Sequence, residues 1–315
     1  MKRMLVAVTA ICFASLLLAS NAFPWGSVTH AYVDDHLGLR GPGNLKELYG
    51  GMAPDLFNYL LNSNQAYLFS QTHGNFWTQA ENFRKVWKAA RYSPEKPYAY
   101  GFVSHNDLWG ADFTAHHDGL FGQGTGYVIA KARILQPSIN DLLRSLGLNV
   151  PKNVTLAIAE GLVETGVDIL VKRKDPSMGV KVSASALLRG SDFPPLLVKA
   201  YAAGFAAHLS ISQAQAAQLI TSSEMEFRKM MILYGQALGQ DEATAIDLIA
   251  QQLAQLAVGF LAAYGIPLPP GTDLTPQIKP GIQQAMSICA SDYLREIEAT
   301  ILFVENQLLS HGISY

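Results

Sequence analysis

The second half of the chain is dominated by apolar residues spaced three and four positions apart, as in the stretch 246–256. Such spacing places apolar side chains on one face of an α-helix. Few segments anywhere alternate as a half-buried strand does, and no internal repeat is visible. The sequence therefore predicts an all-α fold in one domain. Long helices are expected at about 154–173, 182–207, 211–237, 241–264 and 276–310.

Capping residues and prolines mark the expected ends of these helices. Ser212, Asp241 and Thr275 are the expected N-caps, because their side chains can accept hydrogen bonds from the open N–H groups of a first turn. Prolines at 194–195 and within 267–270 are expected to separate helices.

The N-terminus has the parts of a secretory signal peptide. Lys2 and Arg3 form a positive region, Leu5–Leu18 is apolar, and small residues follow. An uncleaved signal anchor is the alternative, but the apolar region is short for a bilayer span. We therefore predict that residues 1–22 are cleaved and that the domain 23–315 is secreted or periplasmic.

Composition limits the kind of site that the chain can build. The formal charge is −2, so no basic field favours a stable complex with nucleic acid. Cys12 and Cys289 are too few for a disulfide scaffold or a thiolate zinc site, and Cys289 is expected in the core. Residues 255–268 are apolar but too few to span a bilayer, which predicts a core helix and no transmembrane segment in the mature chain. Any metal must be bound by His, Asp or Glu.

Six of the eight histidines lie in the first half of the chain. Among them, His105 and His116 are separated from Asp112 by seven and four positions, which places all three on one face of a continuous helix. Imidazole and carboxylate are the ligands that zinc accepts without thiolate. The spacing therefore predicts a metal site; a solvated face with incidental histidines is the alternative. Asp107 and His117 are expected to support the ligands or to lie on the surface.

A second predicted helix carries Glu160, Glu164 and Asp168 on one face. Like charges at this spacing repel, and a shared cation would remove the repulsion. We expect Glu164 to be a ligand, whereas Asp168 fits an acidic solvent-facing surface equally well.

Three further candidates stand alone beside turn signals. His30 follows a Trp-Gly pair, Asp55 follows a segment with two glycines and a proline, and His73 precedes a glycine. A single His or Asp in a loop indicates little, but these precede two segments that also carry ligands.

In their order along the chain, these elements resemble the zinc-dependent phospholipase C family, whose all-helical fold is shared with S1/P1-type nucleases. The resemblance covers about residues 25–170 and implies a phospholipase C/P1 nuclease-like domain, with about 175–315 as additional C-terminal helices. The matching elements are Trp25-Gly with His30, Ala53-Pro-Asp55, His73, Gly101-Phe-Val-Ser-His105 with its downstream Asp and His, and the Glu-bearing helix around 160–168.

The resemblance implies a cluster of two or three zinc ions. Asp55, His73 and His105 would bind one ion. His30 would bind another, and Asp112 would bridge two of the ions.

His116 and Glu164 would hold the remaining ion, with Glu160 where the family usually has a histidine. That replacement makes the site richer in oxygen. There are two other departures from the family. Trp109 stands where the family has its bridging Asp. A dipeptide precedes Trp25, whereas the family's mature chain begins at this Trp.

We expect metal-assisted hydrolysis of a phosphodiester. The metals would ionise a bound water and neutralise charge on the phosphate, and Asp55 would orient the water and accept its proton. A phospholipid head group is the expected substrate, with transient contact to a membrane surface. Leu56-Phe57 and Tyr67-Leu68-Phe69 would then meet acyl chains, although core packing explains these residues as well.

Three alternatives stay open. The chain could be an S1/P1-type nuclease, a phosphomonoesterase, or a non-catalytic secreted protein that binds metal structurally. Metal content separates the last alternative from the enzymes, and turnover on lipid or nucleotide esters separates the enzymes from one another.

Overall fold

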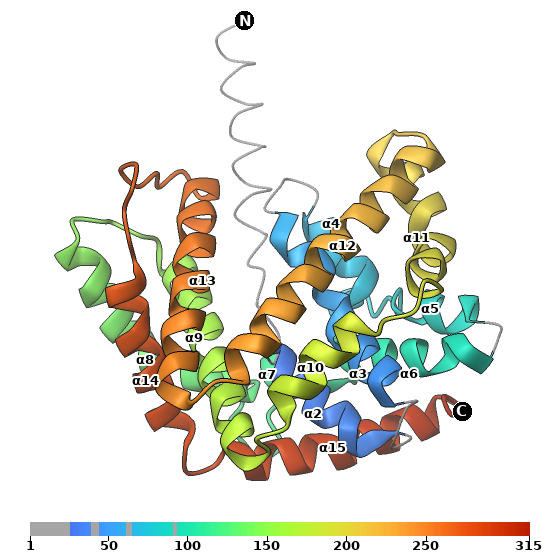
Figure 1. Cartoon of the computed structure of the whole chain (residues 1–315), viewed down its shortest axis with the longest axis horizontal. Coiled ribbons are helices and arrows are strands. Elements are labelled where there is room, and N and C mark those ends of the chain that lie inside the picture. The colour runs from blue at the N-terminus through green and yellow to red at the C-terminus, as the bar shows by residue number, and fades with distance from the viewer. Residues whose placement is uncertain (1–25, 39–43, 61–64, 91–92) are drawn as a thin grey trace, which may run out of the picture.

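The computed structural model describes residues 26–38, 44–60, 65–90 and 93–315 (Figure 1). All regular elements of these residues are helices, apart from one isolated β-bridge between Asn75 and Ala80, so the all-α prediction is confirmed. The helices are α2 (Ser27–Leu37), α3 (Asn44–Met52), η1 (Ala53–Leu60), α4 (Gln65–Thr72), α5 (Arg84–Ala89), η2 (Ser93–Glu95), α6 (Lys96–His105), α7 (Ala111–His116), α8 (Tyr127–Ser145), α9 (Lys152–Lys174), α10 (Met178–Leu187), α11 (Phe193–Leu209), α12 (Gln213–Leu238), α13 (Glu242–Ala263), α14 (Thr275–Cys289) and α15 (Tyr293–Ser310).

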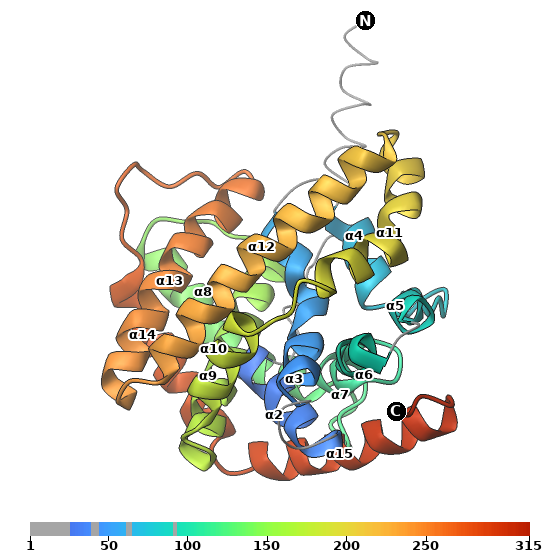
Figure 2. The same ribbon diagram turned by 45° about the vertical axis from the view of Figure 1, so that its right-hand side comes forward.

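Helix α9 links two groups of helices. It packs against α8 and α14 on one side and against α2 on the other. Helix α12 crosses the molecule diagonally, with α10 and α11 packed against it, and α15 lies along the lower edge under α2 and α7 (Figures 1 and 2). One hydrophobic core includes Val28, Phe102, Phe227 and Ile313, so the region with the predicted ligands and the C-terminal helices share their interior.

Three of the five predicted long helices, α9, α12 and α13, have ends close to those expected. The hydroxyl of Ser212 accepts a hydrogen bond from the backbone N–H of Gln215, and the Gln215 side chain accepts one from the Ser212 backbone. Asp241 caps α13 in a similar way, through the backbone N–H three residues on. Thr275 is not an N-cap, because it is the first residue of α14 and its own N–H donates to Asp273.

The other two predicted helices are each divided in two. The stretch 182–207 forms parts of α10 and α11, and Pro194-Pro195 lies in the first turn of α11, where the missing proline N–H costs no hydrogen bond. The stretch 276–310 is interrupted between α14 and α15 near Asp292, whose carboxylate accepts a hydrogen bond from Lys131 of α8 at 2.6 Å. Tertiary contacts therefore decide where these helices end.

Predictions about the chain's cysteines and apolar segments have different outcomes. Cys289 is fully buried, as expected, whereas the signal peptide 1–22, Cys12 and the residues before Gly26 lie outside the described residues. Among the described helices, α13 is the one long and apolar enough to cross a bilayer by length and composition, and 33% of that stretch is buried. Residues 255–268 are the end of α13 and the turn after it. Most are half-buried, and they pack against a small apolar cluster around Ala254 and Leu261 rather than in the main core.

Candidate metal centre

His30 lies in the first turn of α2, and a distant carboxylate holds the start of this helix. Asp168 of α9 accepts hydrogen bonds from the backbone N–H groups of Val28 (3.1 Å) and Thr29 (2.8 Å). The Thr29 and Tyr234 hydroxyls also donate to Asp168, at 2.7 and 2.9 Å. Asp168 thereby satisfies N–H groups that a helix start leaves open, and it fixes the direction of His30. Because Asp168 is fully buried, the solvent-facing alternative for this residue is wrong.

His105 and Asp112 do not lie on one continuous helix, which corrects the prediction. Helix α6 ends at His105, and Asp112 belongs to the separate helix α7. The side chain of Asn106 makes the turn: it donates to a carbonyl of α6 (2.7 Å) and accepts from two N–H groups of the next residues (2.9 and 3.0 Å). Only glycine fits at Gly110, where a Cβ would lie 2.5 Å from the carbonyl oxygen of Ser104. The turn brings Asp112 back toward His105.

Helices α3 and α6 cross closely at glycines. A Cβ on Gly50 would lie 2.2 Å from a carbonyl oxygen of α6, and one on Gly101 would lie 2.1 Å from a carbonyl oxygen of α3. This close approach places the carbonyl oxygen of Gly51 2.7 Å from Nδ1 of His105. We therefore assign the proton of His105 to Nδ1, which leaves the lone pair on Nε2.

His73 is oriented in the same way immediately after α4. Its Nδ1 is 2.8 Å from the Thr72 hydroxyl and 3.3 Å from the carbonyl oxygen of Phe69. Its Nε2 is 3.2 Å from Oδ1 of Asp55, and the Asn58 amide donates to the same carboxylate oxygen at 2.7 Å. Nδ1 of His73 thus faces backbone and hydroxyl, and Nε2 faces the predicted ligands.

Five predicted ligands converge in one buried centre. Nε2 of His30 is 3.0 Å from Oδ1 of Asp112, and Nε2 of His105 is 3.0 Å from Oδ2 of the same carboxylate. Nε2 of His73 is 3.7 Å from that Oδ2. The ligand atoms of His30, His105 and Asp112 all lie within 4.8 Å of one another. The ligand atoms of Asp55, His73 and His105 form a second group and also lie within 4.8 Å of one another.

The protonation of these imidazoles suits a metal. Burial, and then the neighbouring histidines, lower the pKa of His30 well below its usual value, and burial also lowers the pKa of His73 and His105. The Nε2 atoms of His30 and His105 are buried and make no hydrogen bond with any described residue. Buried polar atoms normally have partners, and neutral imidazole nitrogens facing carboxylate oxygens are what a divalent ion requires. The two buried groups therefore fit metal ions.

His105 and Asp112 limit how two ions would share the centre. Since Nδ1 of His105 is occupied by Gly51, its single Nε2 can bind one ion and not both. Asp112 has two oxygens, one toward His30 and the other toward His105. Asp112 therefore lies where the predicted bridging carboxylate would be needed.

His116 lies beside this centre and is paired with Asp107. Its Nδ1 is 3.3 Å from one oxygen of Asp107, and Nε2 of His117 is 2.9 Å from the other. Burial opposes the charge on Asp107, but the two histidines lower its pKa to about 2. Burial also opposes the charge on His116, but Asp107 and the carboxylates of Asp112 and Glu160 raise the pKa of His116 to about 9. Asp107 therefore supports His116.

Glu160 and Glu164 are buried on α9, one turn apart. Burial, and then the charges of Glu160 and Asp55, raise the pKa of Glu164 well above its usual value, and Oε1 of Glu164 has no hydrogen-bond partner among the described residues. Burial also raises the pKa of Glu160, against the opposing effect of His116. Within the described residues, His116 and these two glutamates do not join either group of converging ligand atoms. The donors predicted for a third ion are therefore buried nearby but not gathered.

Two asparagines that shape the centre were not predicted. Asn58 holds Asp55, and Asn106 forms the turn between the two helices that carry His105 and Asp112. Both look like ordinary turn residues in the sequence. The spacing of three between Asp55 and Asn58 is the one local signal.

Of the five residues expected at a lipid-facing rim, three lie in the interior, whereas Tyr67 and Phe69 are half-buried. Leu56, Phe57 and Leu68 are buried in the core, and the ring of Phe69 stacks on His73 at 3.8 Å. Trp109 is buried and donates its indole N–H to Glu81. Core packing therefore explains the buried residues.

Comparisons with known proteins do not identify the chain's family. No family model matches the chain, and neither the curated proteins nor the solved structures give a match. The function is therefore inferred from the site's own geometry.

Proposed function

We propose that the protein is a secreted, metal-dependent phosphoric ester hydrolase, with zinc as the metal and a phospholipid head group as the preferred substrate. The observation that carries the proposal is the convergence of three neutral imidazoles and two carboxylates in one buried centre, at the distances given above. Burying imidazoles and carboxylates is costly unless their polar atoms have partners, and divalent ions would supply partners for the atoms that face the centre.

When bound, divalent ions would lower the pKa of a water and neutralise the charge of a phosphate group. The chain's own residues would then orient the reactants. Asp55 is held by Asn58 and is the carboxylate expected to orient the attacking water and accept its proton. In the metal-free centre, burial raises the pKa of Asp55 to about 6, against His105, His116 and the Asn58 hydrogen bond. Bound divalent ions would keep this carboxylate ionised, as a proton acceptor must be.

The first experiment measures metal content and turnover together. Purified protein should contain two or three zinc equivalents and hydrolyse the chromogenic diester bis(p-nitrophenyl) phosphate. His105→Ala should abolish hydrolysis, because it removes a donor common to both groups. His36→Ala is the matched control, since His36 is exposed and lies on the same helix as His30. One metal or none, with no turnover, would instead support a non-catalytic metal-binding protein.

The second experiment assigns the substrate class. Phosphatidylcholine, single-stranded DNA and a phosphomonoester are compared at equal phosphate concentration. Faster release of phosphorylcholine than of nucleotides or inorganic phosphate supports the phospholipase proposal. Preferential cleavage of DNA would assign an S1/P1-type nuclease activity, and preferential release of inorganic phosphate a phosphomonoesterase.

A further inference from the structure

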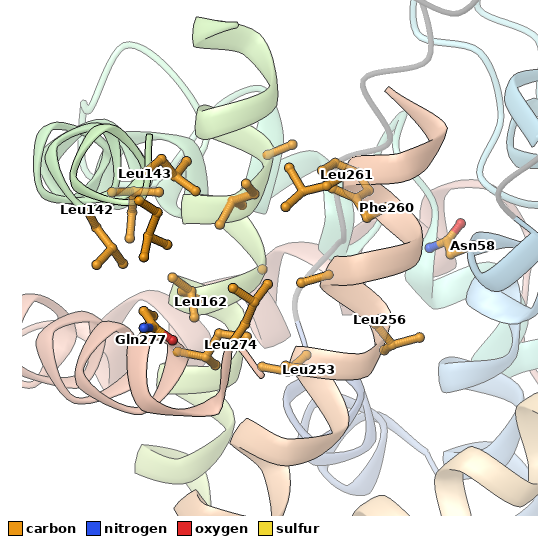
Figure 3. A pocket seen from close by; sticks show the side chains of 17 residues that line it. Asn58, Leu142, Leu143, Leu162, Leu253, Leu256, Phe260, Leu261, Leu274 and Gln277 are labelled. Carbon is orange, nitrogen blue, oxygen red and sulfur yellow. The ribbon is translucent and has the colours of Figure 1, made fainter. Parts of the chain in front are cut away.

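An apolar pocket opens between α8, α9, α13 and α14 (Figure 3). Leu143 of α8, Leu162 of α9, Leu261 of α13 and Leu274 line it. No charged side chain is present among the described residues of its wall. The cavity volume is about 130 Å³, so the pocket is a narrow apolar cavity rather than a large chamber.

The pocket reaches the candidate metal centre. Asn58, at the side of α13 away from α8 in Figure 3, lines the pocket and donates to Asp55 at 2.7 Å. A second hollow between α9, α12 and α13 shares Gly161 and Leu256 with the first and is also lined by Glu164. The two hollows therefore share part of the wall formed by α9 and α13, and Asn58 links the first hollow to Asp55 of the centre.

The chemistry of the wall indicates the ligand. A base or a sugar needs several polar partners, whereas Asn58 and Gln277 are the polar side chains among the described residues here. Helix α13 contributes much of the wall, and only 33% of its most apolar stretch is buried. Aliphatic walls with few polar groups suit a hydrocarbon chain.

We propose that this pocket binds the alkyl or acyl chain of an amphiphilic phosphoric ester whose phosphate reaches the metal centre. The position of the phosphate rests on the proposed function, while binding of the chain does not. The C-terminal helices then select long-chain esters over short ones.

The test compares ligands that differ in chain length. The zinc-loaded protein is titrated calorimetrically with n-dodecyl phosphate and with ethyl phosphate, both below micelle formation. Each buried methylene is expected to strengthen binding by about threefold to fourfold, so dodecyl phosphate should bind at least 100-fold more tightly. Equal affinities would overturn the proposal.

Variants of α13 locate the binding site. Ala257→Trp fills the pocket and should weaken binding of dodecyl phosphate at least tenfold, and Ala257→Leu should weaken it less. Gln255→Trp, on the exposed side of the same helix, should leave the affinity unchanged. Far-UV circular dichroism checks folding, and the Leu variant keeps the test decisive if the Trp variant unfolds. An unchanged affinity in folded Ala257 variants would overturn the proposal.

A chain without phosphate separates this proposal from the proposed function. Metal-free protein should bind the fluorescent fatty acid cis-parinaric acid, and Ala257→Trp should abolish the signal. Such binding without any ester hydrolysis would leave the pocket proposal intact and remove the hydrolase proposal. Absence of fatty-acid binding would overturn the proposal. A dimer in light scattering that Ala257→Trp dissociates would also overturn it, because the pocket would then be an interface between two copies of the chain.

Discussion

His105 shows how backbone contacts prepare an imidazole for a metal. Its Nδ1 faces the carbonyl of Gly51, so its Nε2 is left toward Asp112 at 3.0 Å. His116 is prepared differently, because its partner is the carboxylate of Asp107. A carboxylate behind an imidazole strengthens it as a base and as a ligand. The two histidines should therefore respond differently to pH.

If His116 binds the predicted third ion, that binding should release a proton up to about pH 9. Since Asp107 and the nearby acids raise the pKa of His116 to about 9, the metal-free protein keeps this proton at pH 7, whereas a ligating imidazole must be neutral. The apparent zinc affinity of this site should rise between pH 7 and 9 by up to about tenfold per unit. Calorimetry in buffers of different ionisation enthalpy counts the released protons.

Asp107→Asn is the control, because it keeps His116 but removes the hydrogen-bonded charge that raises its pKa. The rise in affinity should move to lower pH in this variant, although Asp112 and Glu160 still raise the pKa of His116. Equal proton release at pH 8 in the variant and the natural protein would contradict His116 as a ligand.

At the scale of elements, the centre depends on how helices end and cross. Helix α2 begins on Asp168, α6 ends at the Asn106 turn, and α3 reaches α6 through glycines. Each of these features places one ligand, and none of them is itself a ligand. Substitutions outside the ligand set should therefore disturb metal binding.

Gly110→Ala should destabilise the protein by about 2–4 kcal/mol and weaken zinc binding, because its Cβ would press on backbone atoms of the turn at 2.5 Å. Gly204→Ala is the matched control: the nearest atom to its Cβ would be the Tyr67 hydroxyl oxygen at 3.6 Å, and Gly204 is exposed on α11. That change should stabilise the protein by about 0.5–1 kcal/mol. Urea unfolding measures both, and an equal response of the two variants would refute this explanation of Gly110.

At the scale of the whole molecule, the buried ionisable groups weaken the metal-free fold. Burial raises the pKa of Asp55 and Glu164, so keeping these carboxylates ionised at neutral pH costs folding free energy. The lowered pKa of His30 and His73 adds to this cost only at pH values below about 6.5, where an exposed imidazole would be charged. Ions that bind only the folded state should offset this cost.

Zinc should therefore raise the melting temperature. At free zinc 1,000-fold above the dissociation constant, one site contributes about 4 kcal/mol, which corresponds to a rise of roughly 8 °C for a chain of this size. Differential scanning calorimetry with and without a chelator measures the shift. Asp112→Asn should lose most of it, since Asp112 faces both His30 and His105. A full shift in that variant would show that zinc binds elsewhere.

The residues that could bind a metal could be predicted from the sequence, but not the turns and helix crossings that bring them together. His30, Asp55 and His73 stand out because they are polar groups beside turn signals, and the acids of α9 stand out by spacing. The approach of Asp112 to His105 depends on a turn, which helical periodicity cannot represent. The pocket could not be predicted either, because a half-exposed apolar helix such as α13 has the same pattern as a core helix.

The hydrogen bonds between Asp168 and the start of α2 also limit when this part of the site can form during synthesis. Asp168 follows Val28 by 140 residues. At usual synthesis rates of about 5–20 residues per second, roughly 7–28 s separate the two on the ribosome. During that interval His30 has emerged without the carboxylate that directs it. An ion at the proposed site would thus be expected to bind His30 late in the protein's maturation, after α9 has packed.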